Sequence, residues 1–86
     1  MANIKSAKKR ARQAVQNRLR NAGQRSFLRT KIKAVVKLID AGDKSAAADA
    51  YKEAVPVIDA SVSKNLIHAN KAARHKSRLN ARIKAL

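Results

Sequence analysis

The sequence contains no cysteine and no tryptophan, and its 86 residues include one proline, two glycines and two aromatic residues. Without cysteine, the chain can form neither disulfides nor thiolate metal sites, as expected for a reducing cytosol. No apolar run approaches the roughly 20 residues that span a bilayer. No apolar stretch typical of a secretory signal follows Met1. We therefore expect a cytoplasmic chain with no membrane partner.

Acidic residues are also scarce, and all five lie between Asp40 and Asp59. Residues 1–39 carry twelve Lys or Arg and no acid, and residues 60–86 carry seven more with none. The net charge is +16. Because like charges oppose compaction, the simplest explanation for this balance is a polyanionic partner, and nucleic acid is the commonest.

Residue patterns that support catalysis or metal binding are missing. The chain has no glycine-rich loop and no acid outside the central segment, where Asp49 and Glu53 lie one turn apart on an expected exposed face. His68 and His75 are seven positions apart in the sequence. On a helix this separation is about 10.5 Å, which is too far for two ligands of one metal. We expect no enzyme activity, no metal or other cofactor, and no small-molecule substrate.

The composition and periodicity predict helix throughout, because Ala, Lys, Arg and Gln abound and no alternating strand pattern occurs. Ser6 is the expected N-cap of a first helix that ends at Ile39 or Asp40. Gly42 suits the left-handed residue that ends a helix, and Asp43 suits the N-cap of the next.

The second helix is expected from Lys44 to about Ser63. Pro56 lies inside it, and a kinked single helix is favoured over two short ones because the apolar stripe continues in phase. Lys64 and Asn65 form the second corner, since Asn tolerates the left-handed conformation. A third helix follows from about His68 to Leu86. Short corners between long helices predict an all-α, three-helix up-down-up bundle with an extended basic N-terminal helical arm.

The apolar residues divide this single domain, residues 1–86, into two parts. Large aliphatic residues are rare before residue 27, so we expect residues 1–26 to form a basic arm that a partner orders. Residues 27–86 form the bundle, and no homo-oligomer is expected. The expected inward residues are Leu28, Ile32, Val35 and Ile39, then Ala47, Tyr51, Ala54, Val55, Ile58 and Val62, then Ala72, Leu79, Ile83 and Leu86.

The candidate nucleic-acid contacts fall into two groups. Those of the first helix surround the arm, which suits insertion between several phosphate backbones, and they are Lys5, Lys8, Lys9, Arg10, Arg12, Arg18, Arg20, Arg25 and Arg29. Those of the third helix include cations that share a face at three- and four-residue spacings, and they are His68, Asn70, Lys71, Arg74, His75, Lys76 and Arg78. A basic amphipathic helix is also typical of membrane surfaces, but the small apolar face and the available bundle partner disfavour that interpretation.

The two aromatic residues, Phe27 and Tyr51, fall on expected core stripes, which leaves no stacking platform for single-stranded bases. No zinc-finger spacing or recognition-helix motif occurs. Contacts would therefore go mainly to phosphates. Such a protein recognises backbone shape, and folded RNA offers dense and irregular phosphate arrangements.

The sequence resembles the bacterial small-subunit ribosomal protein S20 family over most of its length. Two positions differ from the usual family pattern, with Asn65 in place of Gly and Ala69 in place of Lys. The matching stretches are ANIKSAKKR at 2–10, RTKIK at 29–33, AGDKSAAADAYKEAVPVID at 41–59 and KNLIHANKAARHKSRL at 64–79.

The resemblance implies a structural ribosomal protein that binds 16S ribosomal RNA directly in the body of the small subunit and supports its assembly. It implies a long first helix embedded among RNA helices, and RNA-facing residues within 5–29 and His68–Arg78. The alternative from composition alone is a histone-like DNA-compacting protein, which shares Lys- and Ala-rich helices. The corners at Asp43 and Asn65 favour a bundle and disfavour that alternative.

Overall fold

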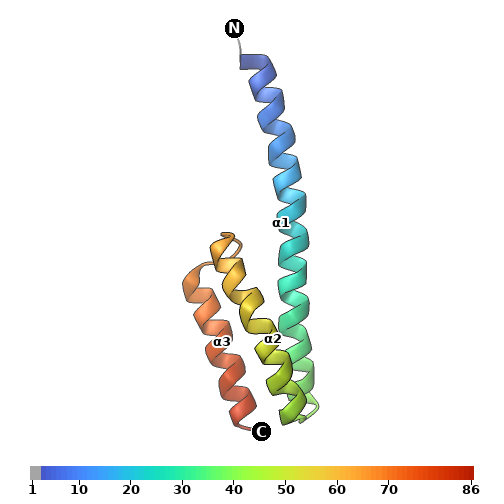
Figure 1. The fold of residues 1–86 in the computed structure, drawn as a ribbon, viewed down its shortest axis with the longest axis vertical. Coiled ribbons are helices and arrows are strands. Elements are labelled where there is room, and N and C mark those ends of the chain that lie inside the picture. Colours follow the sequence, from blue (N-terminus) through green and yellow to red (C-terminus); the bar gives the residue numbers. More distant parts are fainter. Residues whose placement is uncertain (1–2) are drawn as a thin grey trace.

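The computed structural model describes residues 3–86, so Ala2, the first residue of the stretch at 2–10, lies outside it. Three helices follow one another: α1 from Asn3 to Asp40, α2 from Lys44 to Ser63 and α3 from Ala69 to Lys84. Figure 1 shows that α2 runs antiparallel to α1 and that α3 reverses direction again. The described residues contain no strand. The prediction of an all-α up-down-up bundle is confirmed.

The first helix is much longer than the helices it packs against. Helix α1 has 38 residues, whereas α2 has 20 residues. At the usual helical rise these lengths correspond to about 57 Å and about 30 Å. The N-terminal half of α1 therefore extends beyond the bundle (Figure 1). The prediction that Ser6 is the N-cap is wrong: the helix already includes residues 3–5, because no Gly or Pro interrupts the backbone before Ser6.

Both corners are closed by hydrogen bonds of the Schellman type. At the first, Gly42 has a positive φ of 76°. The amides of Gly42 and Asp43 donate to the carbonyls of Ile39 and Leu38. The Asp43 side chain then accepts from the Ala46 amide at 3.1 Å and begins α2. These local assignments agree with the prediction.

The second corner repeats this chemistry with Asn65 as the left-handed residue. Its φ is 58°. The amides of Asn65 and Leu66 donate to the carbonyls of Val62 and Ser61. Leu66 is buried and anchors the connection to the bundle. Helix α3 then begins after His68, one residue later than predicted.

The proline of α2 does not divide the helix. Helix α2 passes through Pro56 as a single element from Lys44 to Ser63, as expected. Two residues shortly before Pro56, Ala54 and Val55, were expected to face inward, but they differ in burial. Ala54 is fully buried, whereas Val55 is only half-buried and lies outside the buried cluster.

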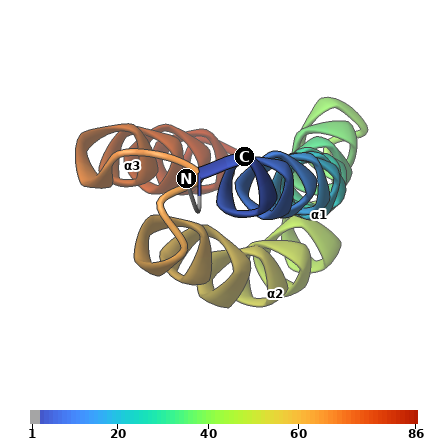
Figure 2. The same ribbon diagram turned by 90° about the horizontal axis from the view of Figure 1, so that it is seen from above.

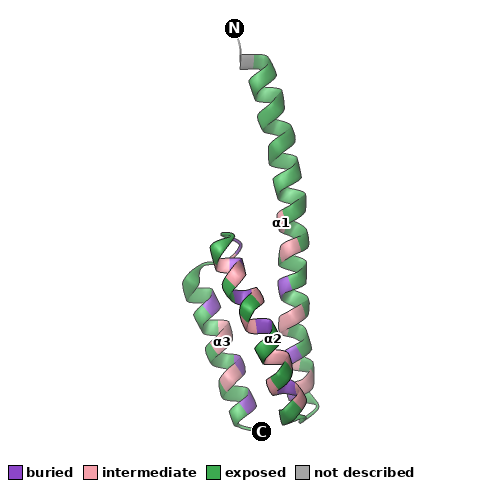
Figure 3. Cartoon of the chain, in the orientation of Figure 1, coloured by how far each residue is buried: buried purple, intermediate pink, exposed green. Residues whose placement is uncertain are grey.

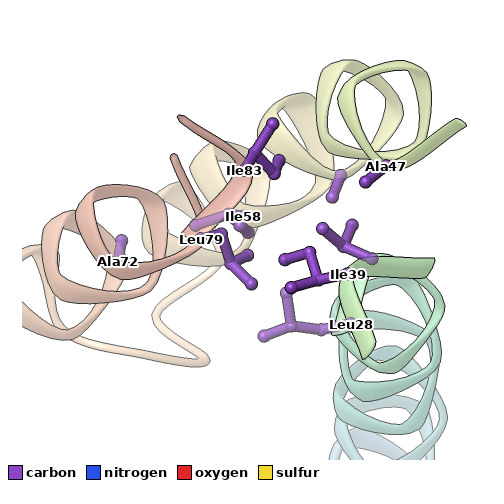
Figure 4. Packing of buried hydrophobic residues seen from close by; sticks show 9 residues of the cluster. Leu28, Ile39, Ala47, Ile58, Ala72, Leu79 and Ile83 are labelled. Atoms are coloured by element: carbon purple, nitrogen blue, oxygen red, sulfur yellow. The ribbon is translucent and has the colours of Figure 1, made fainter. Parts of the chain in front are cut away.

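The core lies between the lower half of α1 and the two shorter helices (Figure 3). Val35 and Ile58 are fully buried, and side chains from all three helices point toward one another in Figure 4. Three of the nine clustered residues are alanines, so the core is thin. The buried cluster is Leu28, Val35, Ile39, Ala47, Ala54, Ile58, Ala72, Leu79 and Ile83.

Two residues expected in the core are exposed. Leu86 is 42% exposed because α3 ends at Lys84, which leaves Leu86 beyond the last helical turn. Phe27 is 53% exposed. Its position lies about 100° around α1 from the buried Leu28, which turns its side chain away from the core.

The second aromatic residue was predicted correctly. Tyr51 packs against the core, and its hydroxyl donates to the Lys76 carbonyl at 3.2 Å. This hydrogen bond joins α2 to α3 and satisfies the polar end of a partly buried ring.

The shape of the molecule departs strongly from a compact sphere. Its principal extents are 64 × 21 × 15 Å and its Cα radius of gyration is 17.7 Å. A compact chain of this length would have a radius of gyration of about 12 Å. The accessible surface is 6485 Å², whereas roughly 5,000 Å² is expected for a compact monomer of this mass. The difference is surface that a partner could cover.

Candidate nucleic-acid interface

The projecting part of α1 is exposed on every side. Every residue from 4 to 20 is exposed (Figure 3). The stretch is about 25 Å long. At about 100° per residue its cations point in all directions around the helix axis. Arg20 donates to the Asn17 side chain at 2.9 Å, and no acid lies in this stretch. The exposed cations of the arm are Lys5, Lys8, Lys9, Arg10, Arg12, Arg18 and Arg20.

A second concentration of charge lies where α1 faces α3, in a groove of about 390 Å³ that we call the basic groove. Arg25, Arg29 and Lys33 line its α1 wall at four-residue spacing, so they form one ridge along the helix. Lys71 and His75 line its α3 wall at the same spacing. No residue of α2 lines this groove, and in the view along the long axis (Figure 2) α2 lies below both α1 and α3. The floor is apolar and consists of Leu28, Ile32, Leu66 and Ile67.

His75 is the histidine of the basic groove, and its surroundings disfavour protonation. Partial burial lowers its pKa below 6.5, and the positive charges of Lys71, Arg78 and Arg74 lower the pKa further. The imidazole is therefore neutral in the free protein near pH 7. An anion placed in the groove would offset the surrounding positive charge and favour protonation of His75.

Acidic side chains neutralise a defined subset of the cations. Lys76 is paired with Asp59 at 2.8 Å, and this carboxylate raises the pKa of Lys76. The other two pairs also join different helices, and they are Arg82 with Asp40 at 2.9 Å and Lys31 with Glu53 at 3.9 Å. Exposed pairs of this kind add little stability. Among the described residues, the cations of the arm and of the basic groove have no acidic partner.

His68 has a structural role at the start of α3. Its Nδ1 atom accepts a hydrogen bond from the Asn70 amide at 3.1 Å and thereby caps α3. Since Nδ1 is an acceptor, the ring proton is carried by Nε2, which remains available as a donor. No sequence rule identified this histidine as a cap, because Ser, Thr, Asp and Asn are the usual N-cap residues.

The structure brings part of the predicted contact set together. Arg25, Arg29, Lys71 and His75 meet in the basic groove, with Arg74 and Arg78 exposed on α3 nearby in sequence. The prediction omitted Lys33, although its four-residue spacing from Arg29 was a usable signal. Lys76 lies apart from this group, on the side of α3 that meets α2, because Asp59 holds it there.

Within residues 3–86, no group of three His, Asp or Glu side chains is arranged to hold a metal ion. No helix in that range is long and apolar enough to cross a membrane.

The chain is similar to known proteins over its whole length. The sequence model of a family described as Ribosomal protein S20 matches residues 2–84. The small ribosomal subunit protein bS20 of Nitrosococcus oceani is 64% identical over 86 residues, covering 100% of this chain and 99% of that protein. Proteins of the same name from Methylococcus capsulatus and Thioalkalivibrio sulfidiphilus are each 65% identical over the whole chain, covering 94% and 100% of their own lengths. These similarities include the arm as well as the bundle.

Proposed function

Because the chain belongs to the ribosomal protein S20 family, it is a structural ribosomal protein and not an enzyme, and we propose that it binds 16S ribosomal RNA directly. The family acts in the cytoplasm as part of the ribosome. The small ribosomal subunit is accordingly its partner.

The observation that carries the proposal is the stretch of the arm from residue 4 to residue 20, whose side chains are exposed on all sides and whose cations lack acidic partners. Like charges along one helix repel one another, so the arm gains stability when phosphates approach it. A helix charged all round can contact phosphates on several sides at once. We propose that the arm lies between RNA segments and holds them together, which would support assembly of the subunit.

The basic groove supports a second contact of a different kind. Its two cationic walls suit one phosphate ridge, while the apolar floor suits the sugar edge of the same strand. Phosphate contacts fix position and orientation without reading sequence. In this proposal, the arm, residues 1–26, and the bundle, residues 27–86, bind separate RNA segments, and the continuous helix α1 fixes the distance between them.

The direct test compares the affinity of the full chain for 16S ribosomal RNA and for duplex DNA of equal nucleotide content at equal salt. Tighter binding to the ribosomal RNA is expected, because an arm surrounded by cations fits several converging phosphate backbones and a DNA duplex offers one rod. Equal or tighter binding to DNA would contradict the proposal and would support a DNA-compacting role.

A further inference from the structure

A second groove, of about 450 Å³, lies between α1 and the C-terminal half of α2. We call it the aromatic groove. Phe27 and Gly23 contribute to it from α1, and Pro56 and Val57 contribute from α2. The cations of Arg20 and Lys64 complete the lining, which contains no acidic side chain. The groove thus combines a predominantly apolar surface with positive charge, and its volume lies within the roughly 300–1,000 Å³ of ligand sites.

Phe27 is the aromatic residue available for contact. It is 53% exposed, and the ammonium of Lys31 lies 5.5 Å from the centroid of its ring. A helical side chain leans over the turn that precedes its own Cα, so the ring of Phe27 lies toward Gly23, four residues earlier. The exposed ring and the missing side chain of Gly23 are therefore neighbours on one face of α1.

Gly23 has no structural justification in the free protein. A glycine in the interior of a helix costs about 1 kcal/mol relative to alanine. Gly42 is the one glycine of the described chain with positive φ, so Gly23 does not require that conformation. A Cβ atom built on Gly23 would meet nothing within 4 Å. The empty space beside Phe27 is therefore not filled by the protein itself.

The charge of the lining indicates what fills this space. An apolar partner alone would not need Arg20 and Lys64, and a second copy of this chain would bring a further net charge of +16 against them. A nucleotide satisfies both parts of the lining, because its flat base has an apolar π-face and its flanking phosphates are anionic.

We propose that the aromatic groove receives an unstacked base of the bound RNA, with the base against Phe27 above Gly23 and the flanking phosphates near Arg20 and Lys64. This inference rests on the proposed binding of 16S ribosomal RNA. It replaces the expectation from sequence that no stacking platform exists, which depended on placing Phe27 in the core.

The first test measures the affinity of the full chain for 16S ribosomal RNA after substitution of Phe27. Stacking on one aromatic side chain predicts a loss of roughly 5- to 160-fold for Phe27→Ala. Phe27→Leu should lose affinity similarly, because it keeps apolar bulk without a ring, whereas Phe27→Tyr should retain most of it. Leu86→Ala, which truncates an exposed apolar residue at the other end of the bundle, is the control and should bind normally.

The salt dependence separates stacking from charge. Phe27→Ala should leave the slope of log affinity against log salt unchanged, since it removes no phosphate contact. Arg20→Gln should make that slope shallower by about 0.7 to 0.9. Phe27 variants that bind like the wild type, while the wild type prefers ribosomal RNA, would overturn the inference and leave the proposed function standing. A wild type without that preference would overturn both.

Gly23→Ala provides a test that loss of folding cannot explain. The substitution should raise the thermal midpoint of the free protein, because it removes a helix-interior glycine and meets open space. It should lower affinity for 16S ribosomal RNA several-fold, because the methyl group occupies the space beside Phe27. Equal or higher affinity would overturn the inference. Self-association that Gly23→Ala abolishes would also overturn it by identifying a second copy as the occupant.

Discussion

The Nζ atom of Lys76 donates a hydrogen bond to the Asp59 carboxylate across 2.8 Å and joins α3 to α2. The same contact raises the pKa of Lys76, first through the hydrogen bond and then through the negative charge of Asp59. This lysine is therefore a cation that the fold already neutralises. Lys71 and His75 lie in the same helix but line the basic groove opposite α1, where no acidic side chain pairs with them.

Removing the partner of Lys76 should increase RNA binding. Asp59→Asn leaves the lysine unpaired and removes one negative charge, so we expect higher affinity for 16S ribosomal RNA. The slope of log affinity against log salt should steepen by up to about 0.9 if Lys76 gains a phosphate. Filter binding at several salt concentrations checks this. Asp49→Asn changes the charge equally but leaves Lys76 paired, and Asp49 has no ion-pair partner among the described residues. If both variants bind alike, net charge explains the effect and Lys76 does not.

RNA binding should be linked to protonation of His75. Burial and the charges of Lys71, Arg78 and Arg74 lower its pKa below 6.5 in the free protein. Arg25, Arg29 and Lys33 line the same groove from α1. Phosphates would offset this charge and raise the pKa of His75 relative to the free protein, so affinity should increase as the pH falls below 6.5 toward the pKa of the free protein. Isothermal titration in buffers of different ionisation enthalpy should detect proton uptake, and His75→Gln should reduce it. Unchanged uptake in that variant would exclude His75.

The same shift has the opposite effect on the free fold. Because the pKa of His75 is lower in the folded protein than in the unfolded chain, its contribution to stability is complete above pH 6.5. That contribution is lost as the pH falls from 6.5 toward the folded pKa. Acid should therefore weaken the free bundle while it strengthens the complex.

Stability and RNA affinity should respond to different residues. Asp43→Ala removes the acceptor of the Ala46 amide and should cost about 1 kcal/mol of unfolding free energy. It should barely change RNA affinity for folded molecules. Replacing Arg10, Arg18 and Arg25 together by Gln should do the reverse: affinity falls by a large factor, while the thermal midpoint stays the same or rises as repulsion decreases. Loss of binding in a folded Asp43→Ala protein would contradict this division.

Helix bounds and corners were predictable because they depend on chemistry within a few residues. Gly42 and Asn65 accept the left-handed conformation, and Asp43 caps the helix that follows. Errors arose where no such local signal exists. The start of α1 depends on how far a helix propagates without an interrupting residue, and Ser6 did not stop it.

Features that depend on how the helices rotate against one another could not be predicted. The pairing of Lys76 with Asp59, and hence the separation of Lys76 from Lys71 and His75, follows from the packing of α3 on α2. The exposure of Phe27 depends on which side of α1 the partner helices cover. Periodicity showed that Phe27 adjoins the apolar stripe, but only packing decided that it lies outside the core.

The most direct test of the central claim is the salt dependence of wild-type affinity for 16S ribosomal RNA. The arm and the basic groove could neutralise on the order of eight phosphates, so the slope of log affinity against log salt should be about −6, taking the factor for single strands. Such a slope, with preference over duplex DNA at equal salt, is the result predicted here. A slope shallower than about −2 would show that charge is not the main source of binding and would contradict the account.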